Sequence, residues 1–115
     1  MKQLVTFIVV IMCFLSCKQK EVEIPADVIP YDTMVQVVTD IQQSEVAIMF
    51  LKNKGMSNKP KPEAMYNYVF DTYKISAEDF DRSFLFYSSE LEVMEKLYGD
   101  VIEELRKRQV EIESN

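Results

Sequence analysis

Apolar residues recur every three to four positions between residues 32 and 53, which is the spacing of one face of an α-helix. The members of this stripe are Met34, Val37, Val38, Ile41, Ile48 and Leu51. Asp32 or Thr33 can cap the helix, because either side chain accepts hydrogen bonds from the free backbone amides of a first turn. Gly55 is placed to end it. The pattern therefore predicts a first helix over residues 32–53.

Glu45 falls near the middle of this apolar stripe. A carboxylate among apolar side chains should be paired, neutral or functional, because burying an isolated charge is costly. Arg82 or a tyrosine hydroxyl could pair with it. Glu45 is therefore the candidate buried acid, with a structural role favoured over a catalytic or ligand-binding one.

Proline and glycine residues separate the first helix from later ones. Residues 52–62 are predicted to form a loop, and residues 63–73 a second, shorter helix. Ser76 and Asp79 then have the spacing of a capping box. From there apolar residues recur in alternating steps of four and three: Phe80, Phe84, Tyr87, Leu91, Met94, Tyr98, Val101 and Leu105.

This second stripe is heptad-like and keeps its phase throughout. Ser89 and Glu92 make another possible capping box, at which the helix could bend or restart. The unbroken phase nevertheless favours one long helix or two nearly coaxial ones. Because no segment has the pattern of a strand, we expect an all-α fold. It is a small bundle of three to four helices over residues 28–110 with a long last helix, followed by a disordered tail at 111–115.

The first sixteen residues resemble an export signal rather than a folded element. A short basic end precedes an apolar run at 4–15, well short of the about 20 residues that a transmembrane helix needs. Ser16 then precedes Cys17, as in bacterial lipoprotein signals. We expect removal of residues 1–16, lipid on Cys17 and a flexible tether at 17–27. An ordinary secretory signal or an uncleaved anchor is the alternative.

Lipid on Cys17 would hold the protein at a membrane of the cell envelope. Lys18 follows the cysteine, and the aspartate that often retains lipoproteins at the inner membrane is absent from that position. This arrangement favours the outer membrane, with the protein facing the periplasm.

Composition excludes several classes of chemistry. The chain has no histidine, two glycines and two cysteines, of which Cys13 leaves with the signal and Cys17 is lipidated. Common zinc sites, nucleophile–histidine pairs and glycine-rich phosphate loops are therefore ruled out. The net charge of −6 argues against nucleic acids and against broad electrostatic binding to anionic membranes. We expect no catalytic residue, no cofactor and no metal.

Four consecutive bulky residues at 84–87 cover most of the circumference of a helix. One side belongs to the heptad-like stripe, and one small bundle need not cover the other side. An apolar face left in water would be a site for a partner protein or a second copy. The alternative is that these side chains fill the core. The candidate partner face comprises Phe86, Val93, Leu97, Val35, Val46 and Phe50.

Charge is unevenly distributed along the chain. Four lysines gather around the first loop with no acid between them: Lys52, Lys54, Lys59 and Lys61. The segment 78–104 is strongly acidic. Both regions are expected to be solvated, with contact between the lysines and an acidic partner or anionic head groups as the alternative. The basic run 106–108 is expected at the end of the last helix, where cations stabilise the helix dipole.

A set of mostly core-type residues between 25 and 105 resembles a known family. The set is Pro25, Val28, Ile29, Pro30, Met34, Asp40, Ile41, Ser44, Glu45, Phe80, Asp81, Ser83, Phe86, Tyr87, Leu97, Tyr98, Val101 and Leu105. Together with the lipoprotein signal, it is similar to the domain of unknown function 4296 family of short Bacteroidota lipoproteins. The resemblance implies a Bacteroidota envelope lipoprotein and brings no activity, cofactor or catalytic residue.

Three classes of function stay open at this point. The favoured one is a non-catalytic helical interaction protein, an accessory subunit of a membrane-bound assembly. The second is a small module of the envelope that binds a lipid or another apolar ligand. The third is an enzyme that uses carboxylates alone, which needs two acids at a defined separation across a cleft. A bundle of this size offers little room for such a cleft.

Overall fold

The computed structural model describes residues 1–3, 22–56 and 60–115, and within them the chain forms four α-helices and no strand. The helices are α2 (Tyr31–Asn53), α3 (Pro62–Tyr73), α4 (Ala77–Ser88) and α5 (Leu91–Ser114). The predicted all-α fold with a long last helix is confirmed. The predicted signal from residue 4 onward, Cys17 and the tether up to residue 21 lie outside the described residues. None of the described helices is long and apolar enough to cross a membrane.

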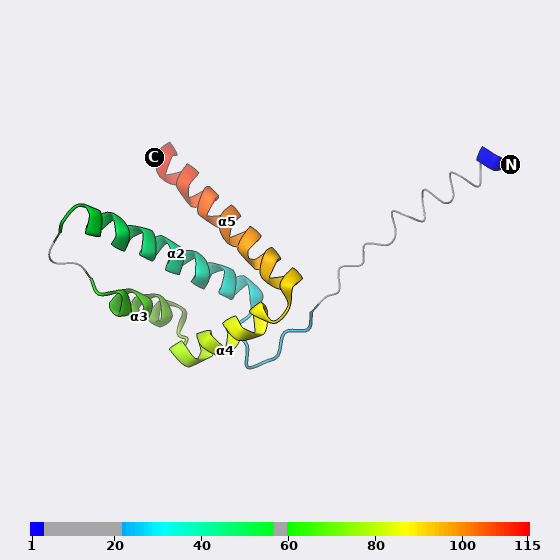
Figure 1. Ribbon diagram of the computed structural model, residues 1–115, viewed down its shortest axis with the longest axis horizontal. Coiled ribbons are helices and arrows are strands. Elements are labelled where there is room, and N and C mark those ends of the chain that lie inside the picture. Colours follow the sequence, from blue (N-terminus) through cyan, green and yellow to red (C-terminus); the bar gives the residue numbers. More distant parts are fainter. Residues whose placement is uncertain (4–21, 57–59) are drawn as a thin grey trace.

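Helix α2 is the centre of the arrangement, because α3 and α5 both pack against it (Figure 1). Side-chain contacts give the directions of the helices. Tyr31 reaches Asp100 and Asp40 reaches Arg108, so α2 and α5 run parallel. Tyr73 also reaches Asp40, whereas the earlier residue of α3, Tyr66, reaches the later residue of α2, Glu45, so these two helices run antiparallel.

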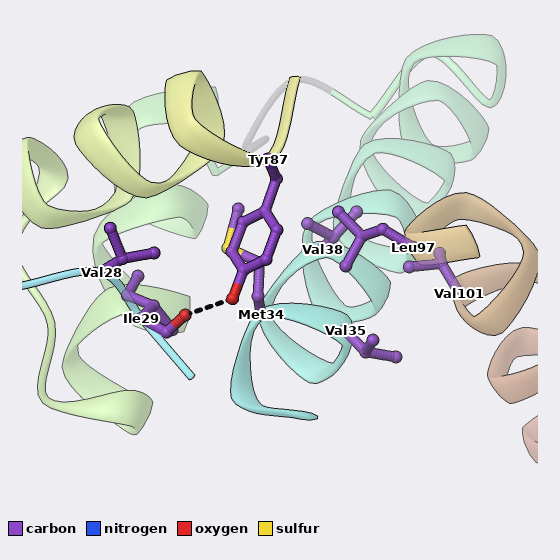
Figure 2. Close-up of a cluster of buried hydrophobic side chains, with 8 residues drawn as sticks. All are labelled: Val28, Ile29, Met34, Val35, Val38, Tyr87, Leu97 and Val101. Carbon is purple, nitrogen blue, oxygen red and sulfur yellow. Dashed lines mark hydrogen bonds between the residues drawn. The ribbon is translucent and has the colours of Figure 1, made fainter. Parts of the chain in front are cut away.

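The larger hydrophobic cluster joins α2, α4 and α5 (Figure 2). Its buried members are Val28, Ile29, Met34, Val35, Val38, Tyr87, Leu97 and Val101. Tyr87, Met34 and Leu97 are the largest completely buried side chains among the residues that the structure describes. The core therefore depends on one aromatic ring from α4 inserted between the two longest helices.

The extended segment before α2 is fastened to α4 by hydrogen bonds. The Ile29 amide donates to Ser83 Oγ at 2.8 Å. The Tyr87 hydroxyl donates to the Ile29 carbonyl at 2.7 Å (Figure 2). Arg82 Nε donates to the Asp27 carbonyl at 3.0 Å. Both backbone groups of a buried residue are thereby satisfied, as a segment outside regular structure requires. The first buried residue of the described chain is Val28.

A smaller cluster lies between α2 and α3. Its buried members are Val37, Ile41, Val69 and Phe70. Ile75 and Phe80 touch both clusters, and the Phe80 ring lies 5.3 Å from the Phe70 ring between centroids. The two clusters are therefore continuous through the start of α4.

Up to the start of α4, two of the predicted helix ends are confirmed and one is wrong. Ser76 and Asp79 form the capping box at the start of α4. Gly55 follows the end of α2 with a φ of 69°, a conformation that glycine adopts without strain. The start of α2 differs from the prediction, because Pro30 is the N-cap and neither Asp32 nor Thr33 caps the helix with its side chain. Proline fixes the backbone angle needed for entry without any side-chain bond.

The chain changes direction sharply between α4 and α5, so the prediction of one long helix or two coaxial ones is wrong (Figure 1). The Ser88 and Ser89 hydroxyls donate to the carbonyls of Leu85 and Phe86 at 3.0 and 2.7 Å. The Ser89 hydroxyl occupies the Phe86 carbonyl, which the next helical amide would otherwise use, and Glu90 is extended. The second predicted capping box does not form, since Glu90 is the N-cap of α5.

Only part of the predicted stripe of α5 is buried: Val101 and Leu105 pack in the larger cluster, but other members are exposed. Leu97 and Val101 are the buried residues of this helix, whereas the predicted stripe residues Leu91 and Tyr98 are 73% and 40% exposed. At its other end α5 continues to Ser114. Residues 111–114 are therefore helical, in place of the predicted disordered tail.

Candidate functional site

An open groove lies between α2 and α5. The two helices separate toward their C-terminal ends (Figure 1). Its volume is about 550 Å³. Helix α2 contributes Gln42, Gln43, Val46, Ala47 and Phe50, and α5 contributes Leu105 and Gln109. This set of residues is called the α2/α5 groove below. Since α3 packs on the other side of α2, one face of α2 is left uncovered in this half of the described bundle.

The apolar side chains of the groove are well exposed. Val46 and Phe50 are each 59% exposed, and they lie four residues apart on one side of α2. Leu105 is half-buried and packs against the larger cluster, so the base of the groove is continuous with the core. Lys54 Nζ lies 5.5 Å from the centroid of the Phe50 ring, at the outer end of the groove. The groove therefore combines apolar side chains with a cation at one end.

Arg108 fixes the inner end of the groove by joining α5 to α2. Its Nη1 contacts Asp40 Oδ1 at 2.5 Å and Gln43 Oε1 at 2.8 Å. Its Nη2 donates to Gln36 Oε1 at 2.6 Å, and its Nε donates to Glu104 Oε1 at 3.4 Å. Arginine offers several donors in a planar fork, so one side chain can hold all four acceptors. We call these five residues the Arg108 cluster.

The charged groups of the Arg108 cluster are paired with one another, and the cluster also contacts α3. Burial acts against the charge of Arg108, but the hydrogen bond to Asp40 and further contacts with carboxylates raise its pKa overall. The Tyr73 hydroxyl donates to the other Asp40 oxygen at 2.7 Å. Burial and this bond raise the pKa of Tyr73 to about 12. The cluster therefore holds three helices together and presents no free reactive group.

A second, polar groove of about 270 Å³ follows the other edge of the α2–α5 contact. Its strongest interactions are internal. The Tyr31 hydroxyl donates to Asp100 Oδ2 at 2.7 Å, and Lys96 Nζ donates to the same oxygen at 2.8 Å. These two bonds lower the pKa of Asp100. Because this carboxylate is already paired, the polar groove is a weaker candidate for a binding site.

The structure divides the predicted partner face between core and surface. Leu97 is completely buried and Val35 is 8% exposed, so neither can contact a partner while the domain is folded, and their placement on that face is wrong. Leu97 lies on the side of α5 that packs against α2, and Val35 is buried in the same cluster from the α2 side. Phe86 and Val93 are half-buried against the same cluster. The exposed members, Val46 and Phe50, both line the α2/α5 groove.

Glu45 is exposed, so its prediction as a buried acid is wrong. The residue lies on the side of α2 that faces α3, beyond the buried part of the interface. The Tyr66 hydroxyl donates to Glu45 Oε1 at 2.5 Å, which is one of the two pairings predicted for it. This bond raises the pKa of Tyr66. Arg82, the other predicted partner, instead pairs with Asp79 and Asp27.

The sequence reasoning missed the Arg108 cluster. The run 106–108 was predicted to end the last helix, but α5 continues beyond it and has no basic residue in its last turn. Arg108 lies four and seven residues after Glu104 and Val101, which places it on the inner face of α5. Helical spacing from Val101 could therefore have predicted that Arg108 faces the bundle.

The described residues offer little for catalysis or metal binding. Within residues 1–3, 22–56 and 60–115, no group of three or more carboxylate, cysteine or histidine side chains could hold a metal ion. Asp40, Asp79 and Asp100 are each engaged in an ion pair. The arrangement of the α2/α5 groove can bind an apolar surface, and that is the chemistry it supports most directly.

One family matches the chain. The sequence model of the family described as a domain of unknown function (DUF4296) matches residues 25–111, which confirms the family resemblance inferred from the sequence. This span contains all of α2, α3 and α4 and most of α5. No curated protein and no solved structure matches the chain.

Proposed function

Since the chain belongs to the family described as a domain of unknown function (DUF4296), we propose its role from its own sequence and groove. It is a non-catalytic lipoprotein of the cell envelope that acts as an interaction subunit of a membrane-bound assembly. The α2/α5 groove is its protein-binding surface. The observation that carries this proposal is the uncovered apolar side of α2, where Val46 and Phe50 are each 59% exposed.

An uncovered apolar groove between two helices favours a helical partner. The residues contributed by α2 recur at steps of three and four, so they form two turns of one face. A partner helix laid between α2 and α5 would bury this face, as in other helix-in-groove interfaces. Exposed aromatic residues such as Phe50 are typical anchors of such interfaces.

The absence of histidine from the sequence supports a non-catalytic role. A reaction that uses carboxylates would need free ones, and those of the polar groove include Asp100, which is held by Lys96 and Tyr31. A carboxylate fixed in an ion pair is a poor proton donor at neutral pH, because the charged form is stabilised.

A lipid on Cys17 would limit the distance between the membrane and the groove. Residues 18–27 separate this cysteine from Val28, the first buried residue of the described chain. About ten extended residues span at most about 35 Å, so the domain would stay within that distance of the bilayer surface. The sequence at Cys17 and Lys18 supports the outer membrane, with the domain on the periplasmic side.

Site-specific photo-crosslinking in living cells tests the proposed binding surface. A benzophenone amino acid replaces Phe50 in the full-length protein, and the matched control carries it at Tyr68, an aromatic residue of α3 that is 74% exposed. We expect a discrete protein adduct from position 50 and none from position 68. Equal labelling of both positions, or no adduct from either, would exclude the groove as a protein-binding surface.

Binding of a small apolar ligand is the second candidate function. The groove volume of about 550 Å³ falls within the range of known ligand sites, and much of its lining is aliphatic or aromatic. Native mass spectrometry of the intact protein, released from membranes in mild detergent, would reveal a retained lipid or metabolite. A Phe50→Glu variant that loses this mass would place the ligand in the groove, whereas a bare protein would reject this candidate.

A further inference from the structure

The C-terminal part of α5 is held to the bundle at one point. Arg108 is the only residue between 106 and 115 that is not exposed. Val110 and Ile112 are 58% and 75% exposed, and Leu105 is the last residue of α5 that packs against a hydrophobic cluster. The apolar contacts that hold α5 to the bundle therefore end about one turn before Arg108.

The polar contacts of this part of α5 also converge on Arg108. Among the described residues, every hydrogen bond and ion pair from residues 106–115 to another helix comes from the Arg108 guanidinium. Its acceptors on α2 are Gln36, Asp40 and Gln43. The other bonds of this stretch stay within residues 103–115. One side chain therefore fixes the position of the last turns of α5.

Helix α2 is held in the same region without Arg108, because α3 packs on its other side. Tyr66 of α3 donates to Glu45, and Ile41 belongs to the buried cluster with Val69 and Phe70. Segments with few buried contacts open at a lower free energy than the core does. Of the two walls of the α2/α5 groove, the wall contributed by α5 is therefore the one that moves more readily.

Arg108 lies in that wall, and its pairing with α2 spans the groove at its inner end. In the sequence it stands between the groove residues Leu105 and Gln109, and Gln43 of the opposite wall accepts from its Nη1 at 2.8 Å. The side chains of Arg108 and Asp40 are 25% and 26% exposed. Water already reaches both groups, so it can replace their bond as the helices part and leave neither charge buried without a partner.

We propose that the Arg108 cluster is a latch that sets the width of the α2/α5 groove. With the latch closed, residues 106–114 stay at a fixed distance from α2. With the latch open, they move relative to α2, while α2 and α3 stay packed together. The groove thereby adjusts its width to what it binds. This inference rests on the proposed function for the use of the groove, but the motion itself requires no bound partner.

Double electron–electron resonance between two nitroxide labels tests the latch in the full-length protein, held in mild detergent. The labels are attached to a keto amino acid at Met49 and Ile112, which leaves the native cysteines unlabelled; both positions are exposed and neither lines the groove. Ile112 lies seven residues beyond Leu105. This is about 10 Å along the helix axis, so a swing of about 30° moves the label by about 5 Å. We expect Arg108→Met to broaden the distance distribution by a similar amount.

Two controls separate the latch from a general loss of structure. Arg106→Met removes an exposed ion pair within α5 and should leave the distance distribution unchanged. In the Arg108→Met protein, a second pair of labels at Met49 and Tyr68 should keep its distribution, because it reports the packing of α2 against α3. Broadening of both label pairs would overturn the latch, since Arg108 would then hold the whole bundle.

Asp40→Asn opens the latch by a second route and serves also if Arg108→Met does not fold. It removes the carboxylate that pairs with Arg108 but keeps a side-chain oxygen as acceptor for Tyr73. We expect it to broaden the same distribution between Met49 and Ile112. An unchanged distribution in this variant would overturn the latch, because packing up to Leu105 would then be enough to hold α5.

The latch and the proposed function fail in different ways. A protein adduct from position 50 together with unchanged distances would overturn the latch and leave the groove as a protein-binding surface. Broadened distances without any adduct would support the latch and overturn the protein-binding role.

Discussion

Tyr87→Phe is the most direct test of how the segment before α2 is held to the bundle. The Tyr87 side chain is completely buried, and its hydroxyl donates to the Ile29 carbonyl at 2.7 Å. Phenylalanine keeps the ring and therefore the packing with Met34 and Leu97. The substitution removes one oxygen and leaves a carbonyl without its donor inside the core.

The expected loss follows from that unsatisfied carbonyl. A buried acceptor that loses its donor costs about 1–3 kcal/mol, whereas a net hydrogen bond contributes about 0.5–1.5 kcal/mol. We expect the free energy of unfolding to fall by about 1–2 kcal/mol for Tyr87→Phe. For a domain of this size, such a loss lowers the melting temperature by about 5–15 °C.

Thermal and urea unfolding followed by circular dichroism at 222 nm would measure this loss. Tyr68→Phe is the matched control, because Tyr68 is 74% exposed and its removal should leave the melting temperature unchanged. Ser83→Ala breaks the neighbouring bond from the Ile29 amide, which is 2.8 Å long. The double variant should lose less than the sum of the single losses, because both bonds hold the same residue. If Tyr87→Phe melts together with Tyr68→Phe, the segment is not fastened through this hydroxyl.

Three further predictions concern the Arg108 cluster, the buried tyrosines and the anchor. Arg108→Met should lower the free energy of unfolding by about 2 kcal/mol, because it leaves a half-buried carboxylate without its cation. The control Arg106→Met should change the free energy of unfolding by less than about 0.5 kcal/mol, and urea titration of both variants measures the difference. Stability should fall between pH 10 and pH 12, because burial raises the pKa values of Tyr73 and Tyr87 to about 12 and unfolding lets both lose protons; a Tyr87→Phe variant with an undiminished fall would contradict this. Cys17→Ser should remove the fatty-acyl mass and release the protein from membranes in fractionation, and an unchanged membrane fraction would contradict lipid anchoring.

The helical segments were predictable because each has a strong local signal. The stripe from Met34 to Ile41 is buried as its spacing predicts, and the capping box of Ser76 and Asp79 forms as predicted. The proline and glycine residues correctly predicted the position of the connection between α2 and α3. These features depend on residues within about one or two turns of each other, which a single sequence displays directly.

The turn between α4 and α5 was not predictable from periodicity. The apolar phase from Phe80 to Leu105 runs through the break, and only hydroxyl bonds from Ser88 and Ser89 to nearby carbonyls reveal the end of α4. Leu97 lies in the core, on the side of α5 that packs against α2. The position of this break therefore determines which side of α5 is exposed, and with it the extent of the candidate groove.

The buried contacts of α2 with α3 and the proposed binding groove lie on different faces of α2, and this separation makes the proposal testable. Val37 and Ile41 are buried against α3, whereas Val46 and Phe50 extend into the groove later in the same helix. Replacing Phe50 removes little buried surface, so its loss should weaken binding without lowering the melting temperature by more than about 2 °C. A core substitution that weakened binding would act through unfolding and would lower both quantities together. The proposed interface is therefore supported only if Phe50 affects association while leaving stability in place.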